Sequence, residues 1–123
     1  MDWKFFLLVA SGGAIGSIFR SFILVLGSTW SSWQTLFTNL SGAILIGFCL
    51  RYWEVNSEPY FFRAFWMIGI CGGYTTFSTF GLDAFNFIKA GQWLNLGFYI
   101  FLSVIGTIMW IFLGYKIFPF LNT

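Results

Sequence analysis

The sequence predicts an all-α integral membrane protein of four transmembrane helices, the third of which is broken halfway across the bilayer. Hydrophobic residues make up 59% of the chain and charged residues 8%, far from the balance of a soluble domain. Four largely uncharged stretches each approach the roughly 20 residues that a helix needs to span a bilayer. We therefore expect one transmembrane domain covering residues 1–123, with spans at about 5–26, 34–51, 63–89 and 93–117, in the cell inner membrane.

The first span, residues 5–26, contains a single charge, Arg20. Charged residues inside membrane helices are functional by default. Arg20 nevertheless lies about six residues from the end of its helix, so its side chain can also reach the interface. Lys4 and the apolar run after it resemble a signal peptide, but no small-residue cleavage site follows. We therefore expect a mature helix.

Small residues recur on the first and third spans at spacings that place them on one helix face. Such small-xxx-small surfaces let two helix backbones approach closely within a membrane. The spacing therefore predicts that these faces meet, and glycine-rich faces of this kind also suit an interface between two subunits. The residues are Gly12, Gly13 and Gly16 in the first span, and Gly69 and Gly73 in the third.

Polar residues form one stripe on the second span and another on the fourth, each at helical spacing. A buried amide such as that of Asn39 needs a partner in hydrocarbon, so Asn39 either handles a solute or joins two helices. The hydroxyls of the fourth span have the same two interpretations, because Ser and Thr in membrane helices also bond to backbone. The stripes are Thr35, Asn39 and Gly42 on the second span, and Tyr99, Ser103 and Thr107 on the fourth.

The third span is interrupted by the segment Gly72–Gly81, which holds a glycine pair and five hydroxyl side chains. Irregular backbone at membrane depth is stable only where protein buries it or where it lines a polar cavity. In transporters such breaks mark ion and substrate sites. Thr75 and Thr79 lie on one line of this segment and Phe77 and Phe80 on another, with lipid contact as the default for the two rings. The segment predicts a site for a small solute, with the break at the glycine pair.

The composition supports few other classes of function. The chain has no histidine, no metal-ligand spacing and no nucleophile with a base beside it in sequence, so we expect neither an enzyme nor a nucleic-acid-binding protein. Cys49 and Cys71 lie among apolar neighbours, where cysteine acts as a small filler. Asp83, just past the broken segment, is either a vestibule charge or an ordinary helix-end acid. The acids of the chain are Asp2, Glu54, Glu58 and Asp83.

The assembly follows from the size of the bundle. Four packed helices fill their own centre with side chains, so we expect a solute pathway between subunits. A dimer with two-fold symmetry is the commonest such assembly. Four spans place both termini on one side, and a small excess of Lys and Arg there puts that side in the cytoplasm by a narrow margin. A margin this narrow leaves room for insertion in both orientations.

Four motifs, taken in order, make the chain recognisable. They are Gly12-Gly13-x-x-Gly16-x-x-x-Arg20, Asn39-Leu40-x-Gly42, Gly72-Gly73-x-Thr75-Thr76-Phe77-Ser78-Thr79-Phe80 and Tyr99-x-x-x-Ser103-x-x-x-Thr107. With these motifs the chain resembles, over essentially its whole length, the Fluc (CrcB) family of fluoride channels. The third motif is long and highly specific, whereas the others gain weight from their order and spacing.

The resemblance implies an antiparallel, dual-topology homodimer in the lipid bilayer. Two fluoride pathways would run along the subunit interface and let fluoride leave the cytoplasm. It also implies a structural sodium ion on the two-fold axis, held by the backbone carbonyls of Gly72 and Thr75 of each subunit. The ring edges of Phe77 and Phe80 would face the anion. The other pathway residues that it implies are Asn39, Thr79, Tyr99, Ser103 and Thr107, with Arg20 near the vestibule.

Two positions depart from the commonest family pattern. Many relatives carry serine where this chain has Thr107, and glutamate where it has Asp83. Without the resemblance, the residues support a small-ion pathway but do not single out fluoride. Two alternatives stay open at this point. One is a small dual-topology exporter of cationic drugs, which needs a membrane-embedded carboxylate, and the other is an accessory bundle that stabilises a larger membrane complex.

Overall fold

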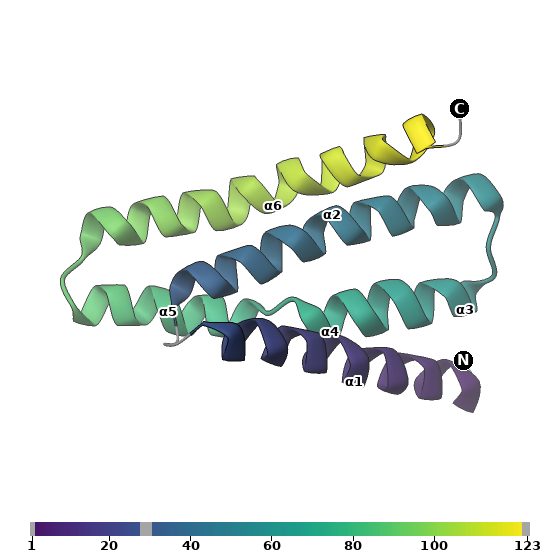
Figure 1. Ribbon diagram of the computed structural model, residues 1–123, viewed down its shortest axis with the longest axis horizontal. Helices are drawn as coiled ribbons and strands as arrows, with labels where there is room; N and C mark the ends of the chain where they lie inside the picture. The colour runs from purple at the N-terminus through teal and green to yellow at the C-terminus, as the bar shows by residue number, and fades with distance from the viewer. Residues whose placement is uncertain (1, 28–30, 122–123) are drawn as a thin grey trace.

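The computed structural model describes residues 2–27 and 31–121, and all of the regular structure within them is helical (Figure 1). This confirms the all-α prediction. Three helices are long and continuous, whereas the third helix of the bundle is assembled from shorter segments. The long helices are α1 (Trp3–Leu26), α2 (Ser32–Asn56) and α6 (Trp93–Leu121). The third helix consists of α3 (Tyr60–Phe62), the π-helix η1 (Arg63–Cys71), α4 (Gly72–Tyr74) and α5 (Phe77–Lys89).

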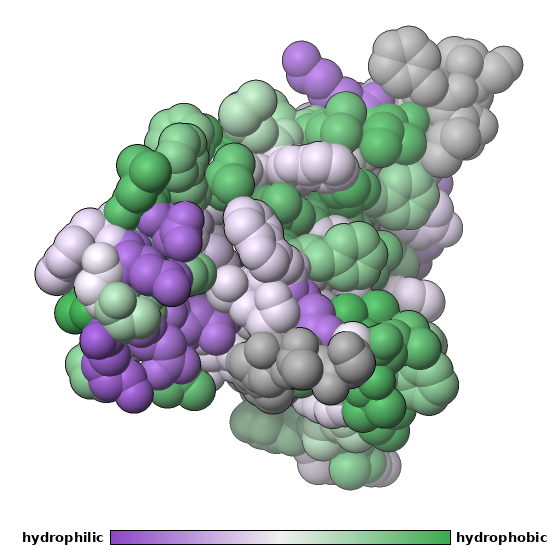
Figure 2. Space-filling model, turned by 60° about the vertical axis from the view of Figure 1, so that its left-hand side comes forward, coloured by the Kyte–Doolittle hydropathy of each residue, from purple (hydrophilic) through white to green (hydrophobic). Residues whose placement is uncertain are grey.

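The surface of the bundle suits a membrane. By length and composition, α1, α2 and α6 are each long and apolar enough to cross one. Large apolar side chains stay exposed on these helices, for example Phe22 at 65% and Phe112 at 63%. Figure 2 shows hydrophobic side chains over much of the visible face, with hydrophilic ones mainly at its lower left and at its top. Because contiguous apolar patches of this kind are rare on water-soluble monomers, lipid or another protein must cover them.

The helices are arranged as two pairs. α1 lies along the third helix, and α2 lies along α6 (Figure 1). Within each pair the two helices run in the same direction, and the two pairs run in opposite directions. The start of α1 and the end of α6 therefore lie at the same end of the molecule, as expected for a bundle with an even number of spans.

Glycines bring the backbones of both pairs into contact. A Cβ atom added at Gly16 would collide with the backbone of the third helix, and one at Gly73 would collide with the carbonyl group of Gly13. The predicted meeting of the small faces of the first and third helices is thus confirmed. Because Gly12, Gly16 and Gly69 are buried within one protomer, they do not form the subunit interface that their spacing also suggested. Gly47 and Gly114 play the same part between α2 and α6, which the sequence analysis did not anticipate.

The π-helix η1 is a second departure from regular α geometry in the third helix. It covers Arg63–Cys71 and ends directly before α4. The sequence predicts an ordinary helix here, because the apolar run contains no residue that signals the wider turn. π-Helical turns are rare and occur frequently at functional sites. The third helix therefore changes its geometry twice within a short stretch, first in η1 and then at the interruption described next.

Candidate functional site

The third helix is interrupted at Thr75 and Thr76, whose backbones are extended. Thr75 has φ −85° and ψ 159°, and Thr76 has φ −152° and ψ 121°. The sequence predicts an interruption at the glycine pair, but Gly72 and Gly73 belong to the helical segment α4. Gly73 instead provides the close approach to Gly13 of α1. Gly73 is therefore a packing residue, Gly72 is not in close contact with α1, and the extended pair follows directly after their helical turn.

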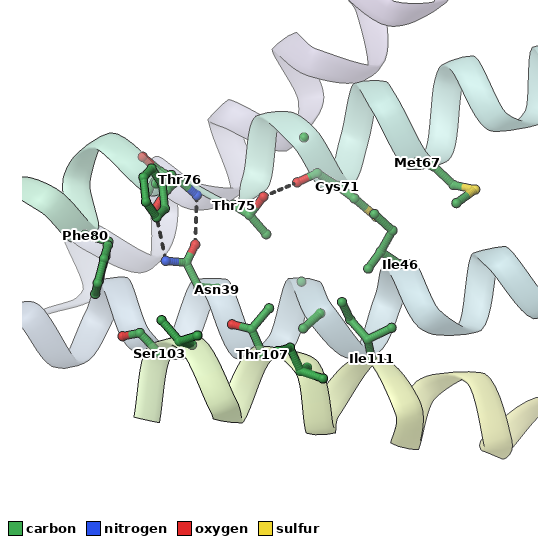
Figure 3. Close-up of a pocket in the computed structure, with 16 residues that line it drawn as sticks. Asn39, Ile46, Met67, Cys71, Thr75, Thr76, Phe80, Ser103, Thr107 and Ile111 are labelled. Carbon is green, nitrogen blue, oxygen red and sulfur yellow. Dashed lines mark hydrogen bonds between the residues drawn. The ribbon is translucent and has the colours of Figure 1, made fainter. Parts of the chain in front are cut away.

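Asn39 of α2 forms hydrogen bonds with backbone groups that have no helical partner at the interruption. In an unbroken helix the N–H of Thr76 would donate to the carbonyl of Gly72. Here it donates to Asn39 Oδ1 at 2.8 Å, and Asn39 Nδ2 donates to the carbonyl of Thr76 at 3.0 Å (Figure 3). A buried backbone group left unpaired would cost about 1–3 kcal/mol, so this pair of hydrogen bonds stabilises the interruption. One N–H of the Asn39 amide remains beyond the one that holds Thr76.

Side chains of α1 hold the opposite side of the interruption. Arg20 Nη1 donates to the carbonyl of Thr75 at 3.3 Å, and Ser17 Oγ donates to the carbonyl of Gly73 at 3.4 Å. Arg20 thus reaches the broken backbone rather than the membrane interface. The Thr75 hydroxyl turns back and donates to the carbonyl of Cys71 at 2.8 Å, as Figure 3 shows.

A cavity of about 470 Å³ lies between α2, the interrupted helix and α6 (Figure 3). It brings together residues that the sequence analysis singled out on three different spans, and apolar side chains complete its wall. The predicted site residues that line it are Asn39, Gly72, Thr75, Phe77, Phe80, Ser103 and Thr107. The predicted site residues outside this lining are Arg20, Thr79 and Tyr99.

Ser103 lines this cavity and has a buried, unsatisfied hydroxyl. The residue is 8% exposed, and among the described residues its Oγ atom has no hydrogen-bond partner. Thr107 follows one helical turn later and lines the same wall of α6. Hydroxyls in membrane helices usually bond to a carbonyl of their own helix. Because the Ser103 hydroxyl does not, it is free to bond to a species inside the cavity.

The aromatic residues of the site form a stack that leads away from the cavity. The Phe77 and Phe80 ring centroids are 5.4 Å apart, and Phe80 lies 5.4 Å from the ring of Tyr99, nearly parallel to it. Phe77 is 83% exposed, whereas Tyr99 is 2% exposed. Tyr99 thus stands behind Phe80 and supports it.

From the sequence, Asp83 could be either a vestibule charge or an ordinary helix-end acid. It is buried, with 4% exposure, and accepts a hydrogen bond from the Tyr99 hydroxyl at 2.8 Å. It also lines a second, smaller cavity together with Ser32, Asn86, Phe87 and Gln92. Nothing in the sequence pairs Asp83 with Tyr99, because the two residues lie on different helices. The spacing of four between Thr79 and Asp83 was the one available signal that this acid shares a helix face with the broken segment.

Thr76 is the N-cap of α5, and Thr79 is its partner in this cap. The backbone N–H of Thr79 donates to Thr76 Oγ1 at 3.2 Å, and the same oxygen donates to Thr79 Oγ1 at 3.1 Å. This is the N-cap arrangement that satisfies one of the free N–H groups at the start of a helix. Thr79 therefore helps α5 to begin immediately after the interruption.

Comparison with known proteins points to one family. The profile of the family described as CrcB-like protein, Camphor Resistance (CrcB), matches residues 7–115. The chain is 43% identical over 110 residues to a fluoride-specific ion channel FluC of Nitrobacter winogradskyi, covering 85% of this chain and 87% of the relative. It is 42% identical over 111 residues to FluC 1 of Nitrobacter hamburgensis, with the same coverage. It is also 41% identical over 120 residues to a FluC of Leptospira interrogans, covering 90% of this chain and 91% of the relative.

Proposed function

The chain belongs to the CrcB family of fluoride channels, and on this premise we propose that it forms a passive, fluoride-selective channel that exports fluoride from the cytoplasm. It is a multi-pass membrane protein and not an enzyme. The observation that carries the proposal is the cavity between α2, α6 and the interrupted helix, whose wall includes Ser103, a residue with an unpaired, buried hydroxyl.

The cavity offers the groups that can replace the water around a small anion. Fluoride holds its water tightly, so a pathway has to supply hydrogen-bond donors in its place. Asn39 keeps one N–H after bonding to Thr76, and Ser103 and Thr107 contribute hydroxyls from the facing helix. Several weak sites in series favour passage of an ion over its retention. These three side chains are the proposed polar lining.

Phe77 and Phe80 are the proposed apolar part of the same pathway. An aromatic ring has a positive edge, which attracts an anion weakly. Phe80 is held in place by its stacking on Tyr99, and Tyr99 is held in turn by its hydrogen bond to Asp83. We therefore assign Tyr99 a supporting part behind the lining, and Thr79 a part in starting the helix that carries both phenylalanines.

A second copy of the chain completes the pathway in this proposal. Phe77 is 83% exposed although it borders the cavity, so one protomer leaves this side of the pathway uncovered. An antiparallel homodimer would cover it twice by symmetry and create two equivalent pathways at the interface. The narrow difference in Lys and Arg content between the two ends is compatible with insertion in both orientations.

Two backbone carbonyls at the interruption fit the proposed structural sodium ion. The carbonyl of Gly72 has lost its helical partner to Asn39, and Gly72 lines the cavity. Thr75 also lines the cavity, and its carbonyl uses one lone pair for Arg20, which leaves a second. Carbonyls of unwound helices are suitable ligands for sodium. Two copies of the chain would supply four such oxygens, and the bound cation would raise the local potential for a nearby anion.

Fluoride efflux from liposomes that contain the purified protein tests the proposal. We expect efflux well above that of empty vesicles, and little efflux when chloride replaces fluoride. The variant Met109→Leu is a matched control, because Met109 is 64% exposed on α6 and lies outside the cavity lining. Efflux no faster than from empty vesicles would refute the channel.

A further inference from the structure

One peptide group of the interruption is held at both of its ends. The carbonyl of Thr75 and the N–H of Thr76 belong to the same planar, trans peptide unit. Arg20 of α1 donates to the carbonyl at 3.3 Å, and Asn39 of α2 accepts from the N–H at 2.8 Å. Since the two groups of a trans peptide point in opposite directions, this unit forms a bridge between α1 and α2.

The rotation of this peptide plane decides where the Thr75 carbonyl points. Thr75 and Thr76 are both extended, so no helical hydrogen bond fixes the plane between them. A rotation of the unit would change ψ of Thr75 and φ of Thr76 in opposite senses and leave the chain on either side in place. Without side-chain anchors, the carbonyl could turn to a different side of the interruption.

We propose that Arg20 and Asn39 are positioning residues that lock the Thr75–Thr76 peptide plane from two sides. The inference rests on the proposed function only in the use made of the Thr75 carbonyl, whose direction the locked plane fixes. Asn39 also bonds to the carbonyl of Thr76 at 3.0 Å, so it fixes the following peptide unit and the direction in which α5 begins. Arg20 accordingly acts on the backbone of the site and not as a free charge at its entrance.

Exchange of the Thr76 amide hydrogen with solvent measures this lock directly. The probe is the full-length protein, labelled with ¹⁵N-threonine, in lipid nanodiscs without fluoride. We expect Asn39→Ala to speed the exchange of the Thr76 N–H by about tenfold, the effect of losing one hydrogen bond. Asn39→Asp keeps an acceptor for this N–H and is expected to leave it protected. The N–H groups of Thr75, bonded to the Cys71 carbonyl at 3.0 Å, and of Thr107 serve as internal references.

Arg20 provides the sharper test, because it does not touch the Thr76 N–H. If the plane is held as one unit, Arg20→Met loosens the carbonyl end and speeds exchange at the N–H end by about threefold, less than the loss of the direct bond. Arg20→Lys keeps a cationic donor on a long side chain, and since the native bond comes from a single nitrogen, Nη1, we expect it to preserve protection.

Three results would overturn the lock. They are unchanged Thr76 exchange in Asn39→Ala, unchanged exchange in Arg20→Met, and equal acceleration of the Thr75 and Thr107 references. The Arg20 pair decides the question if Asn39→Ala does not fold. Fluoride efflux of the unaltered protein is measured in parallel. A protected Thr76 amide in a protein without efflux would refute the channel and leave the lock intact. Efflux from a protein with an unprotected Thr76 amide would refute the lock and leave the channel intact.

Discussion

The third helix is packed differently on its two sides. On the side of α1, glycines let backbone rest on backbone, so that a single added methyl at Gly73 would collide with the carbonyl of Gly13. On the side of α2 and α6, the same helix borders a cavity of about 470 Å³ with hydroxyl, amide and aromatic side chains in its wall. We call these the closed side and the open side.

The comparison shows how one helix can be both anchored and functional. Irregular backbone at membrane depth needs partners for its polar groups. The closed side fixes the helix through close packing and through Arg20 and Ser17, which bond to carbonyls of the broken stretch. On the open side the amide of Asn39 completes this bonding, and among the described residues the Ser103 hydroxyl in the cavity wall stays unpaired. Close packing against α1 therefore holds the third helix in place while a cavity remains on the side of α2 and α6.

Adding a methyl group to the closed side should have the largest effect. We expect Gly73→Ala to lower the free energy of unfolding by about 1–3 kcal/mol, as overpacking does, and to abolish fluoride efflux as the broken segment shifts. Gly81→Ala is the matched control, because a Cβ at Gly81 meets nothing within 4 Å. Thermal unfolding in detergent, together with efflux, measures both. Equal stability of the two variants would mean that the closed side does not depend on close approach.

Replacing an aromatic ring on the open side should remove flux and leave the fold intact. We expect Phe80→Ile to reduce fluoride efflux to the level of empty vesicles, because isoleucine has no positive ring edge. Phe101→Ile, at a ring that is 59% exposed on α6 and outside the cavity lining, is expected to conduct normally. Size-exclusion chromatography and unfolding temperature check that both variants fold. Normal efflux in Phe80→Ile would contradict the assignment of the ring edge.

Removing one hydroxyl from the open side should have a partial effect. We expect Ser103→Ala to slow fluoride efflux by up to about tenfold, the equivalent of one hydrogen bond to the ion. Its stability should be unchanged, since the native hydroxyl has no partner among the described residues. Ser21→Ala is the control, because the Ser21 hydroxyl donates to the carbonyl of Ser17 on α1 at 2.9 Å. Equal rates of fluoride efflux in Ser103→Ala and Ser21→Ala would show that the Ser103 hydroxyl has no part in conduction.

Much of the closed side could be predicted from sequence, because it depends on spacing along single helices. The small faces of the first and third helices were expected to meet, and they do. The position of the interruption was not predictable in the same way. A glycine pair is a strong breaking signal, but here both glycines are helical, and Gly73 packs closely against α1. The extended pair then falls at two threonines, where the bonds from Asn39 and Arg20 are available.

The open side depends on contacts between helices, which spacing along one helix cannot reveal. The stripe of Tyr99, Ser103 and Thr107 is regular in sequence, yet only Ser103 and Thr107 reach the cavity. Tyr99 is turned toward Asp83 of α5 and hydrogen-bonds to it. Similarly, Asn39 could be read as an ion ligand or as a link between helices, and the structure places it on the backbone of Thr76.

The smallest effect is expected where the closed side meets solvent. Asp2 caps α1 by accepting the N–H of Phe5 at 3.2 Å, and it accepts the hydroxyl of Tyr60 at the start of the third helix at 3.1 Å. The bond from Phe5 lowers the pKa of Asp2 from its ordinary value of 3.8, and the bond from Tyr60 acts in the same direction. A lowered pKa means that the carboxylate stabilises the fold at pH values above 3.8 and loses this contribution as the pH falls through the lower, folded-state value.

Asn in place of Asp2 keeps a capping oxygen but does not titrate. Unfolding temperatures between about pH 6 and pH 2 should therefore converge for the native protein and Asp2→Asn at the acid end, with the native protein more stable above it. Parallel curves over this range would show that the junction between α1 and the third helix does not depend on the charge of Asp2.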